Sequence, residues 1–170
     1  MELRELTYED VAFYEEVHCD PRMMTELGGP LPRGQERKVR DIVDGVRDGT
    51  NWYFVIVPGD DPSVGAGTVC IWEGSHDGQP INEIGWMVLP RFQGRGLGKA
   101  AVLAVLDRAR AESRWDVVHA FPGVTNAASN AMCRAAGFTQ LEECDIEYVG
   151  RTLRCNHWRI DLRAAGPREP

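Results

Sequence analysis

The 170-residue sequence predicts an α/β domain whose central sheet is mixed and mostly antiparallel, with about seven strands and about four flanking helices. Two observations lead to this fold class. Three strand-like segments follow one another with only short turns between them, which favours antiparallel pairing. A helical segment then separates the third strand from the next, and such a crossover is typical of parallel pairing in the same sheet.

The first half of the chain is expected to contain a strand, two helices and a three-stranded meander. Thr7 to Asp10 fits the capping-box variant S/T-x-x-D/E ahead of a helix that reaches Val17 or His18. Apolar residues at helical spacing predict a second helix, which Gly49 ends. The expected elements are a strand at Leu3–Leu6, an irregular stretch at Met23–Pro32, a helix at Gln35–Asp48, and strands at Trp52–Val57, Val64–Trp72 and Ile81–Leu89, with turns at Pro58–Pro62 and Gly74–Gly78.

The second half alternates helices and strands and ends in a hairpin. On the last strand Trp158, Ile160 and Leu162 alternate with polar residues, so one of its faces is expected to be buried. The expected elements are helices at Leu97–Ala111 and Asn126–Ala136, and strands at Trp115–Phe121, Phe138–Tyr148 and Arg151–Leu162, with a turn at Gly150. With no internal repeat or linker, residues 1–163 are expected to form one domain, and residues 164–170 a disordered tail.

Composition and charge argue against several classes of protein. The formal net charge of −7 disfavours nucleic acid as a partner. The five cysteines form no C-x-x-C and no paired Cys/His spacing, and no two of the four histidines have metal-ligand spacing, so no metal is expected. The charged N-terminus does not resemble a signal peptide, and the apolar runs are shorter than the ~20 residues of a membrane helix. A cytoplasmic protein with reduced thiols is therefore expected.

A glycine-rich turn is the most informative motif of the sequence. Gly94, Gly96 and Gly98 alternate between an expected strand and the start of a helix, where free N–H groups and the helix dipole form an anion site. Cations flank the turn at Arg91, Arg95 and Lys99. The alternative is a tight loop without a ligand. The P-loop and Rossmann patterns do not fit, because each lacks a required residue in this segment.

The segment from Gln93 to Gly98 resembles the pyrophosphate motif Q/R-x-x-G-x-G/A of the GNAT (GCN5-related N-acetyltransferase) superfamily. Asn126–Ser129 followed by Gly137-Phe138 is similar to that family's N-x-x-S…G-F segment. The stretch from Asp20 to Pro30 looks like the ribosomal-protein N-acetyltransferase branch. The resemblance covers nearly the whole chain. It implies a single acyl-CoA N-acyltransferase domain that moves acetyl from acetyl-CoA directly to a primary amine of a small molecule or a protein N-terminus.

The same resemblance implies roles for individual residues. Glu83 is the candidate general base, with a solvated glutamate paired to an arginine as the alternative. Cys133 stands where many members of the family have the tyrosine that acts as general acid. Its thiol could donate the proton to the departing thiolate, or it could be a small apolar packing residue. In the second case Tyr148 or solvent would have to supply that proton. Asn126 is expected near the pantetheine or the amine, although it or Thr125 could simply cap a helix. The resemblance implies that the cofactor contacts are Met87, Val88 and Leu89 on a bulged strand, then Gln93, Gly94, Arg95, Gly96, Leu97, Gly98 and Lys99, and also Asn126 and Ser129.

Two other functions remain open on the sequence. A non-catalytic acyl-CoA sensor of the same fold is favoured by Cys133 at the tyrosine position and disfavoured by the intact Gln93–Gly98 motif. A protein that binds the phosphates of a nucleotide is the third alternative. His119 is a further candidate for acid–base work, because it lies in the strand before the Asn126 segment. A homodimer is a possibility that the resemblance allows.

Overall fold

The computed structural model describes residues 1–163, so the expected tail at 164–170 lies outside the described residues. Seven strands form one sheet in the order β1-β2-β3-β4-β5-β7-β6, and the expected fold class is confirmed. The strands are β1 (Glu2–Glu5), β2 (Trp52–Val57), β3 (Gly67–His76), β4 (Gln79–Val88), β5 (Val117–Ala120), β6 (Thr139–Tyr148) and β7 (Arg151–Asp161). The helices are α1 (Val11–His18), α2 (Glu36–Arg47), α3 (Leu97–Ala111) and α4 (Ala127–Ala136), with short 3-10 turns η1 (Tyr8–Asp10), η2 (Thr25–Leu27) and η3 (Pro90–Phe92).

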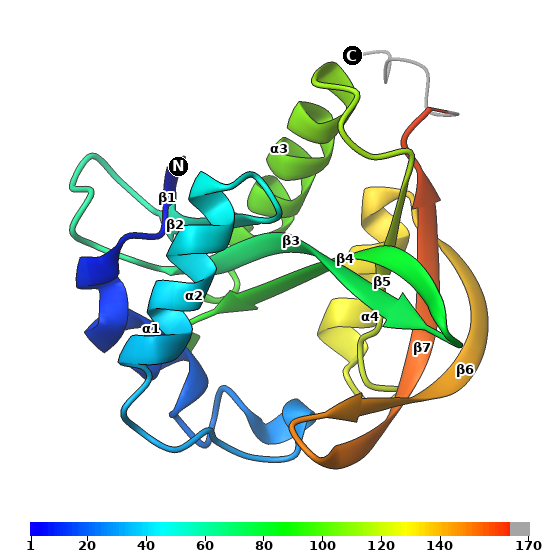
Figure 1. Cartoon of the computed structure of the whole chain (residues 1–170), viewed down its shortest axis with the longest axis horizontal. Helices are drawn as coiled ribbons and strands as arrows, with labels where there is room; N and C mark the ends of the chain where they lie inside the picture. Colours follow the sequence, from blue (N-terminus) through cyan, green and yellow to red (C-terminus); the bar gives the residue numbers. More distant parts are fainter. Residues whose placement is uncertain (164–170) are drawn as a thin grey trace.

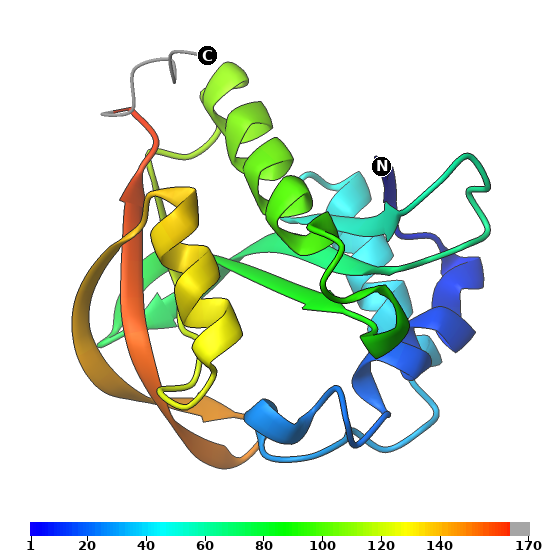
Figure 2. The ribbon, with the colours of Figure 1, turned by 180° about the vertical axis from the view of Figure 1, so that it is seen from behind.

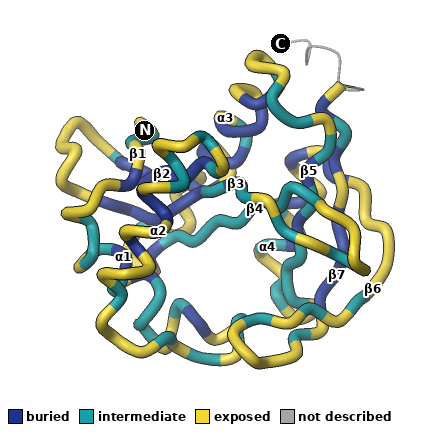
Figure 3. The backbone as a smooth tube through the Cα atoms, in the orientation of Figure 1, coloured by how far each residue is buried: buried dark blue, intermediate teal, exposed yellow. Residues whose placement is uncertain are grey.

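Helices cover both faces of the sheet, and β2 shows how the chain fills both sides. All six residues of β2 are buried, since Trp52, Phe54 and Ile56 pack with α3 while Tyr53 and Val55 pack with α1 and α2. We call the side of α1 and α2 the front face and the side of α3 and α4 the back face (Figures 1 and 2). Buried residues lie mainly on β2, β3, β7 and α3, whereas β4 is mostly half-buried and the hairpins are largely exposed (Figure 3).

The pairing of β4 with β5 is the one parallel contact in the sheet of residues 1–163, and it is short. Only Glu83 and His119 are in register. Beyond that pair β4 runs toward α1 while β5 continues beside β7, so the two strands separate (Figure 1). This opens the sheet toward the end of β4, where the glycine-rich turn begins.

Two expected boundaries differ from the structure because of one tight turn. The β3–β4 register runs without interruption from Gly67↔Val88 to His76↔Gln79, so β3 extends four residues past Trp72. The turn is formed by Asp77 and Gly78, both with positive φ (49° and 74°). This is the two-residue hairpin geometry that Asp-Gly favours, and the sequence expectation had spread the turn over Gly74–Gly78.

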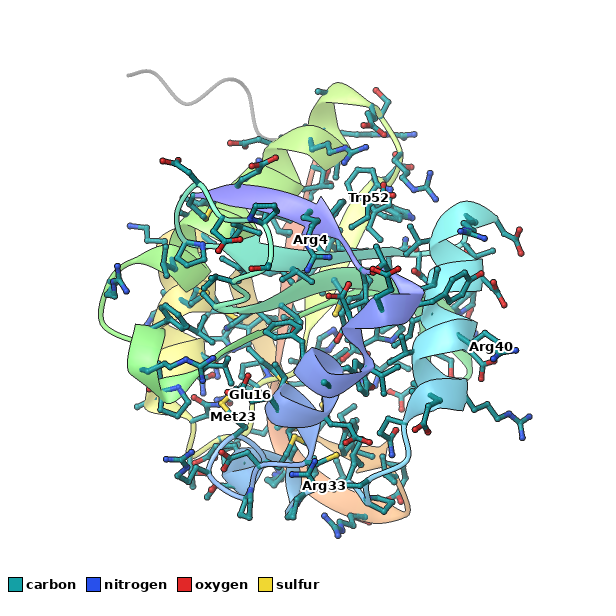
Figure 4. The ribbon with its side chains drawn as sticks, turned by 90° about the vertical axis from the view of Figure 1, so that its left-hand side faces the viewer. Arg4, Glu16, Met23, Arg33, Arg40 and Trp52 are labelled. Atoms are coloured by element: carbon teal, nitrogen blue, oxygen red, sulfur yellow. The ribbon has the colours of Figure 1, made fainter. Side chains whose placement is uncertain are left out.

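The start of the chain is fixed by a bidentate ion pair. Arg4 on β1, labelled in Figure 4, donates to both carboxylate oxygens of Asp10, at 2.8 Å each. The N–H and hydroxyl of Thr7 also donate to Asp10, at 2.8 and 2.9 Å, so the expected Thr7–Asp10 cap is present ahead of η1 and α1. No helix within residues 1–163 is long and apolar enough to cross a membrane.

Candidate active site

The glycine-rich turn has the backbone geometry of an open helix N-terminus. Gly94 and Gly96 have φ of 73° and 75°, in the left-handed region that glycine adopts without strain, and a Cβ on either would meet nothing within 4 Å. Gly96 is the N-cap of α3 and no side chain caps this helix. The first N–H groups of a helix have no carbonyl partner within it, so α3 presents its positive end toward open space.

Gly98 has a different role, which is close packing. A Cβ at this position would lie 3.1 Å from Met132 Cε and 3.1 Å from Val88 Cγ2. The start of α3 therefore sits directly against α4 and the end of β4. The Gln93 side chain holds the turn to the same strand, because its Nε2 donates to the Val88 carbonyl at 2.9 Å.

The cations around the turn divide into paired and unpaired ones. Arg91 forms an ion pair with Glu16 of α1, so most of its charge is already matched. Arg95 and Lys99 are exposed, and within residues 1–163 no ion pair to either is found. The guanidinium of Arg95 lies 5.6 Å from the ring centre of Phe92. The turn therefore combines free N–H groups with two available positive charges, as an anionic ligand requires.

The end of β4 only partly matches what the resemblance implies. The expected bulge at Met87–Val88 is wrong, because the β3–β4 register is continuous through both residues. The Leu89 N–H donates to the Ala66 carbonyl at 2.8 Å and its side chain is buried, so this N–H is not available to a ligand. The separation of β4 from β5 takes the place of a bulge in opening the sheet.

Glu83 lies in the middle of β4 on the front face. Its neighbours Ile84 and Trp86 pack into the back-face core, and strand alternation places Glu83 on the opposite side. Burial raises the pKa of the Glu83 carboxyl to about 7, because the charged form loses its hydration. No arginine pairs with it in the described chain, so the alternative of a solvated ion pair does not hold.

Thiols and phenols share the front face with Glu83. Burial raises the pKa of Cys70 to about 12 and of Cys155 to about 11, and in both cases the Glu83 charge adds to the effect. Burial also raises the pKa of Tyr148, with a further contribution from Cys70. Tyr148 is therefore a protonated phenol at neutral pH. Its interaction with Cys70, which also interacts with Glu83, places it near the candidate base.

Asn126 and Ser129 are placed at the start of α4. The Asn126 side chain accepts the Ser129 N–H at 3.0 Å, so the capping role is confirmed for Asn126. The cofactor contact that the resemblance implies for both residues stays a prediction.

Cys133 lies on the other side of the sheet from Glu83. It is fully buried in the back-face core with Ala136 and Trp158, and burial raises its pKa to about 12. A thiol with none of its surface exposed cannot exchange its proton readily with a bound ligand. The geometry matches the packing alternative rather than the thiol acid.

The η2 segment and the β6–β7 hairpin are hydrogen-bonded to each other, and we call these two segments together the wall. Arg151, next to the hairpin tip, donates to the carbonyls of Gly28 and Gly29, the latter at 3.1 Å. The Thr125 hydroxyl, in the turn before α4, donates to Glu26 of η2 at 2.8 Å. These contacts bring together segments more than 95 residues apart in sequence, at the lower edge of Figure 1.

The sequence reasoning missed a buried polar network that holds this region. Asn130 Oδ1 accepts from Asn156 Nδ2 (2.8 Å) and Trp158 Nε1 (2.9 Å), while its Nδ2 donates to the Gly123 and Asn126 carbonyls. Every polar atom of this amide is satisfied, which fixes the start of α4 against β7. A polar Asn at a buried helical position was the only signal that could have found it.

The sheet order, the separated β4–β5 pair and the open glycine-rich helix start define an acyltransferase-type domain. The chain belongs to the GNAT family: the acetyltransferase (GNAT) domain model matches residues 1–139. A search of curated protein sequences finds no match.

Solved structures share this fold at low sequence identity. A spermidine N-acetyltransferase from Vibrio cholerae in complex with CoA and spermine has a TM-score of 0.77 at 18% identity, with 95% of each chain covered. Ribosomal-protein-alanine N-acetyltransferase from Brucella melitensis has a TM-score of 0.73 at 19% identity, covering 95% of this chain and 99% of that one. The protein yncA from Salmonella typhimurium, solved with acetyl-CoA, has a TM-score of 0.75 at 20% identity, covering 98% and 96%.

Proposed function

We propose that this protein is an N-acetyltransferase that transfers the acetyl group of acetyl-CoA directly to a primary amine of a small molecule or a protein N-terminus. The observation that carries the proposal is the arrangement along β4. A buried carboxyl with a pKa of about 7 lies in the middle of the strand, and an open helix N-terminus follows its end. Similar folds solved with CoA or acetyl-CoA support acetyl-CoA as the donor.

In the proposed reaction, the turn from Gln93 to Lys99 binds the pyrophosphate of the donor through free N–H groups, with Arg95 and Lys99 supplying positive charge. The thioester then lies where β4 and β5 separate, beside Met87 and Val88. Asn126 and Ser129, at the start of α4, are proposed to border the pantetheine. Leu89 shapes this end of β4 from its buried position.

Glu83 is proposed as the general base. A protonated amine is not a nucleophile, so one proton must leave before the nitrogen attacks the thioester carbonyl carbon. Glu83 accepts that proton, directly or through one water. The nitrogen of the tetrahedral intermediate then loses its second proton to solvent as the C–S bond breaks with loss of the CoA thiolate. Tyr148 is proposed to return a proton to the thiolate, because Cys133 is buried behind the sheet. The wall of η2 and the β6–β7 hairpin is proposed to hold the amine substrate.

The experiment has two arms. Calorimetric titration with acetyl-CoA, with ATP and NAD as controls, tests the donor; binding of acetyl-CoA alone at micromolar Kd, about −8 kcal/mol, is expected. A panel of polyamines, aminoglycosides and N-terminal peptides, read by mass spectrometry for an added acetyl group, tests the transfer. Acetyl-CoA binding without transfer to any amine would favour the sensor alternative. Binding of ATP in place of acetyl-CoA would overturn the proposal.

A further inference from the structure

Three side chains outside the proposed active-site machinery converge where the β3–β4 hairpin meets β6 and β7. His76 is the last residue of β3, Glu142 lies in β6 and His157 lies in β7. One ligand atom from each, a ring nitrogen or a carboxylate oxygen, lies within 4.8 Å of the other two. These residues are 66 and 15 positions apart in sequence, which is why their spacing gave no metal signal.

The ring nitrogens that face this point lack hydrogen-bond partners. Nε2 of His76 and Nδ1 of His157 are both buried with no partner among the described residues. His157 Nδ1 is 3.9 Å from Glu142 Oε1, and His76 Nε2 is 3.7 Å from Asp77 Oδ2, both too long for hydrogen bonds. The His157 side chain is only 7% exposed, so water does not replace the missing partners easily. Buried polar atoms without partners are rare and point to a ligand.

His119 prepares His157 for coordination. His119 Nδ1 lies 2.7 Å from His157 Nε2, so one of these nitrogens must donate to the other. When His157 Nε2–H is the donor, the lone pair of His157 Nδ1 is free and directed to the point shared with His76 and Glu142. A metal-bound histidine commonly donates its other ring N–H to a fixed acceptor, which sets its tautomer and orientation.

We propose that His76, Glu142 and His157 bind a divalent transition-metal ion, with Zn²⁺ as the best fit. Two neutral imidazoles and a carboxylate are a ligand set that Zn²⁺ accepts, at about 2.0–2.2 Å from each atom. Closing the site to those distances requires the ligand atoms to move closer together, and the Glu142 side chain is the most exposed of the three, at 65% against 12% for His76 and 7% for His157. Phe121 stacks on the His157 ring at 4.6 Å between centres and limits access from one side.

The ion would link strands from both sides of the separated pair. It joins the end of β3 to β6 and β7, whereas β4 and β5 between them share only one register pair (Figure 1). Its effect is therefore on the stability of the hairpin contact and not on proton transfer during acetylation. The metal site and the proposed acetyltransferase activity are independent and fail separately.

The test is a Zn²⁺ titration of the chelator-treated 170-residue chain, followed by calorimetry and by thermal unfolding. One ion per chain and a raised Tm are expected. Glu142→Gln and His76→Gln should each weaken Zn²⁺ binding at least about tenfold. The matched control is Glu143→Gln, since Glu143 pairs with Arg154 instead and should leave affinity unchanged. Equal affinity of the Glu142 and Glu143 variants, or no binding to the wild type, would overturn the site.

Two further measurements guard against other ligands and against misfolding. The chain has five cysteines, which could bind the metal instead of the proposed ligands. If His76, Glu142 and His157 hold the ion, the spectrum of the Co²⁺-substituted protein should show no thiolate-to-metal charge transfer. A strong charge-transfer band would place the metal on cysteine and overturn the proposal.

His119→Gln preserves an acceptor for His157 Nε2–H, and His119→Leu removes it, so Zn²⁺ should bind the Leu variant about tenfold more weakly than the Gln variant. Equal binding by the two would remove His119 from the site.

Discussion

Glu83 on β4 and His119 on β5 face each other at the single point where these parallel strands are in register. Beyond this pair β5 continues beside β7 and the two strands separate. The candidate base is therefore located at the one point of the described chain where β4 and β5 pair. Burial at this point raises the pKa of the carboxyl to about 7, and the proposed substrate approaches it from the side where the strands separate.

The first prediction concerns the pH dependence of turnover. Glu83 acts as a base only when it is deprotonated, so kcat at saturating acetyl-CoA and amine should rise with pH through an apparent pKa near 7 and then level off. In Glu83→Gln we expect kcat to fall at least about 100-fold and the rise near pH 7 to disappear, while the Kd for acetyl-CoA stays unchanged. The same inflection persisting in the variant would assign it to another group.

The second prediction uses the same pKa as a measure of stability. The folded pKa of about 7 exceeds the ordinary value of 4.5, so the folded chain holds this proton more tightly than the unfolded chain. Its contribution to the free energy of unfolding is therefore lost as pH rises from about 4.5 to 7. Glu83→Gln should gain stability relative to the wild type across this range, by up to about 3 kcal/mol. Urea unfolding at pH 5 and pH 8 measures it, with the exposed Glu73→Gln as control; a gain independent of pH would contradict the cause.

The third prediction separates strain from ligand contact at the glycine-rich turn. Gly96→Ala forces a side chain into a φ of 75° and should cost about 1–2 kcal/mol of stability. Gly78→Ala is the matched control, because Gly78 has a φ of 74° and equally open surroundings in a distant hairpin. Both variants should lose similar stability, but only Gly96→Ala should weaken acetyl-CoA binding, on the order of tenfold. Equal affinity of the two would remove the turn from the cofactor site.

Local patterns in the sequence were sufficient to predict most of the fold. Alternation on β7 and the helical stripe of α3 each predicted the buried face, because one face of each element packs on the sheet. The end of β3 was misplaced because Gly74 gave a local turn signal, although the continuous pairing with β4 continues to His76.

The candidate site was only partly predictable. Glu83 and the turn from Gln93 to Gly98 lie on one strand–turn–helix segment, and their local motif was visible. The amide network of Asn130 and the convergence of His76 with His157 depend on strands that become neighbours only in the folded sheet. The missing bulge in β4 could not be predicted either, because it was carried over from a resemblance and not from residues of this chain.

The fourth prediction concerns the wall that is proposed to hold the amine. Arg151→Ala removes the bonds to the Gly28 and Gly29 carbonyls and should loosen the η2 segment from the β6–β7 hairpin. We expect the KM for the amine to rise several-fold while the Kd for acetyl-CoA stays constant, because the two sites lie on different elements. Arg154→Ala is the control, since its exposed pairs with Glu143 and Asp145 lie within the same hairpin. An equal rise in KM in both variants would mean that general loosening of the hairpin is the cause.

The fifth prediction tests whether the Asn130 amide holds the start of α4 in place. Asn130 is 5% exposed and accepts from two buried donors, Asn156 Nδ2 and Trp158 Nε1. Asn130→Leu keeps the volume but leaves both donors without a partner, at about 1–3 kcal/mol each, so we expect a loss of roughly 3 kcal/mol in the free energy of unfolding. Gln140→Ala, which removes one bond at the exposed edge of the same network, should cost less than about 1 kcal/mol.

The Asn130 variant also reports on function, because the same amide donates to the Asn126 carbonyl at 2.8 Å. If Asn126 borders the pantetheine as proposed, Asn130→Leu should weaken acetyl-CoA binding even at temperatures where it is fully folded. Denaturant unfolding and calorimetry on the same samples separate the two effects. A variant as stable as the wild type would contradict the network's role. A variant that is destabilised but binds acetyl-CoA normally would confine Asn130 to the core and remove the start of α4 from the cofactor site.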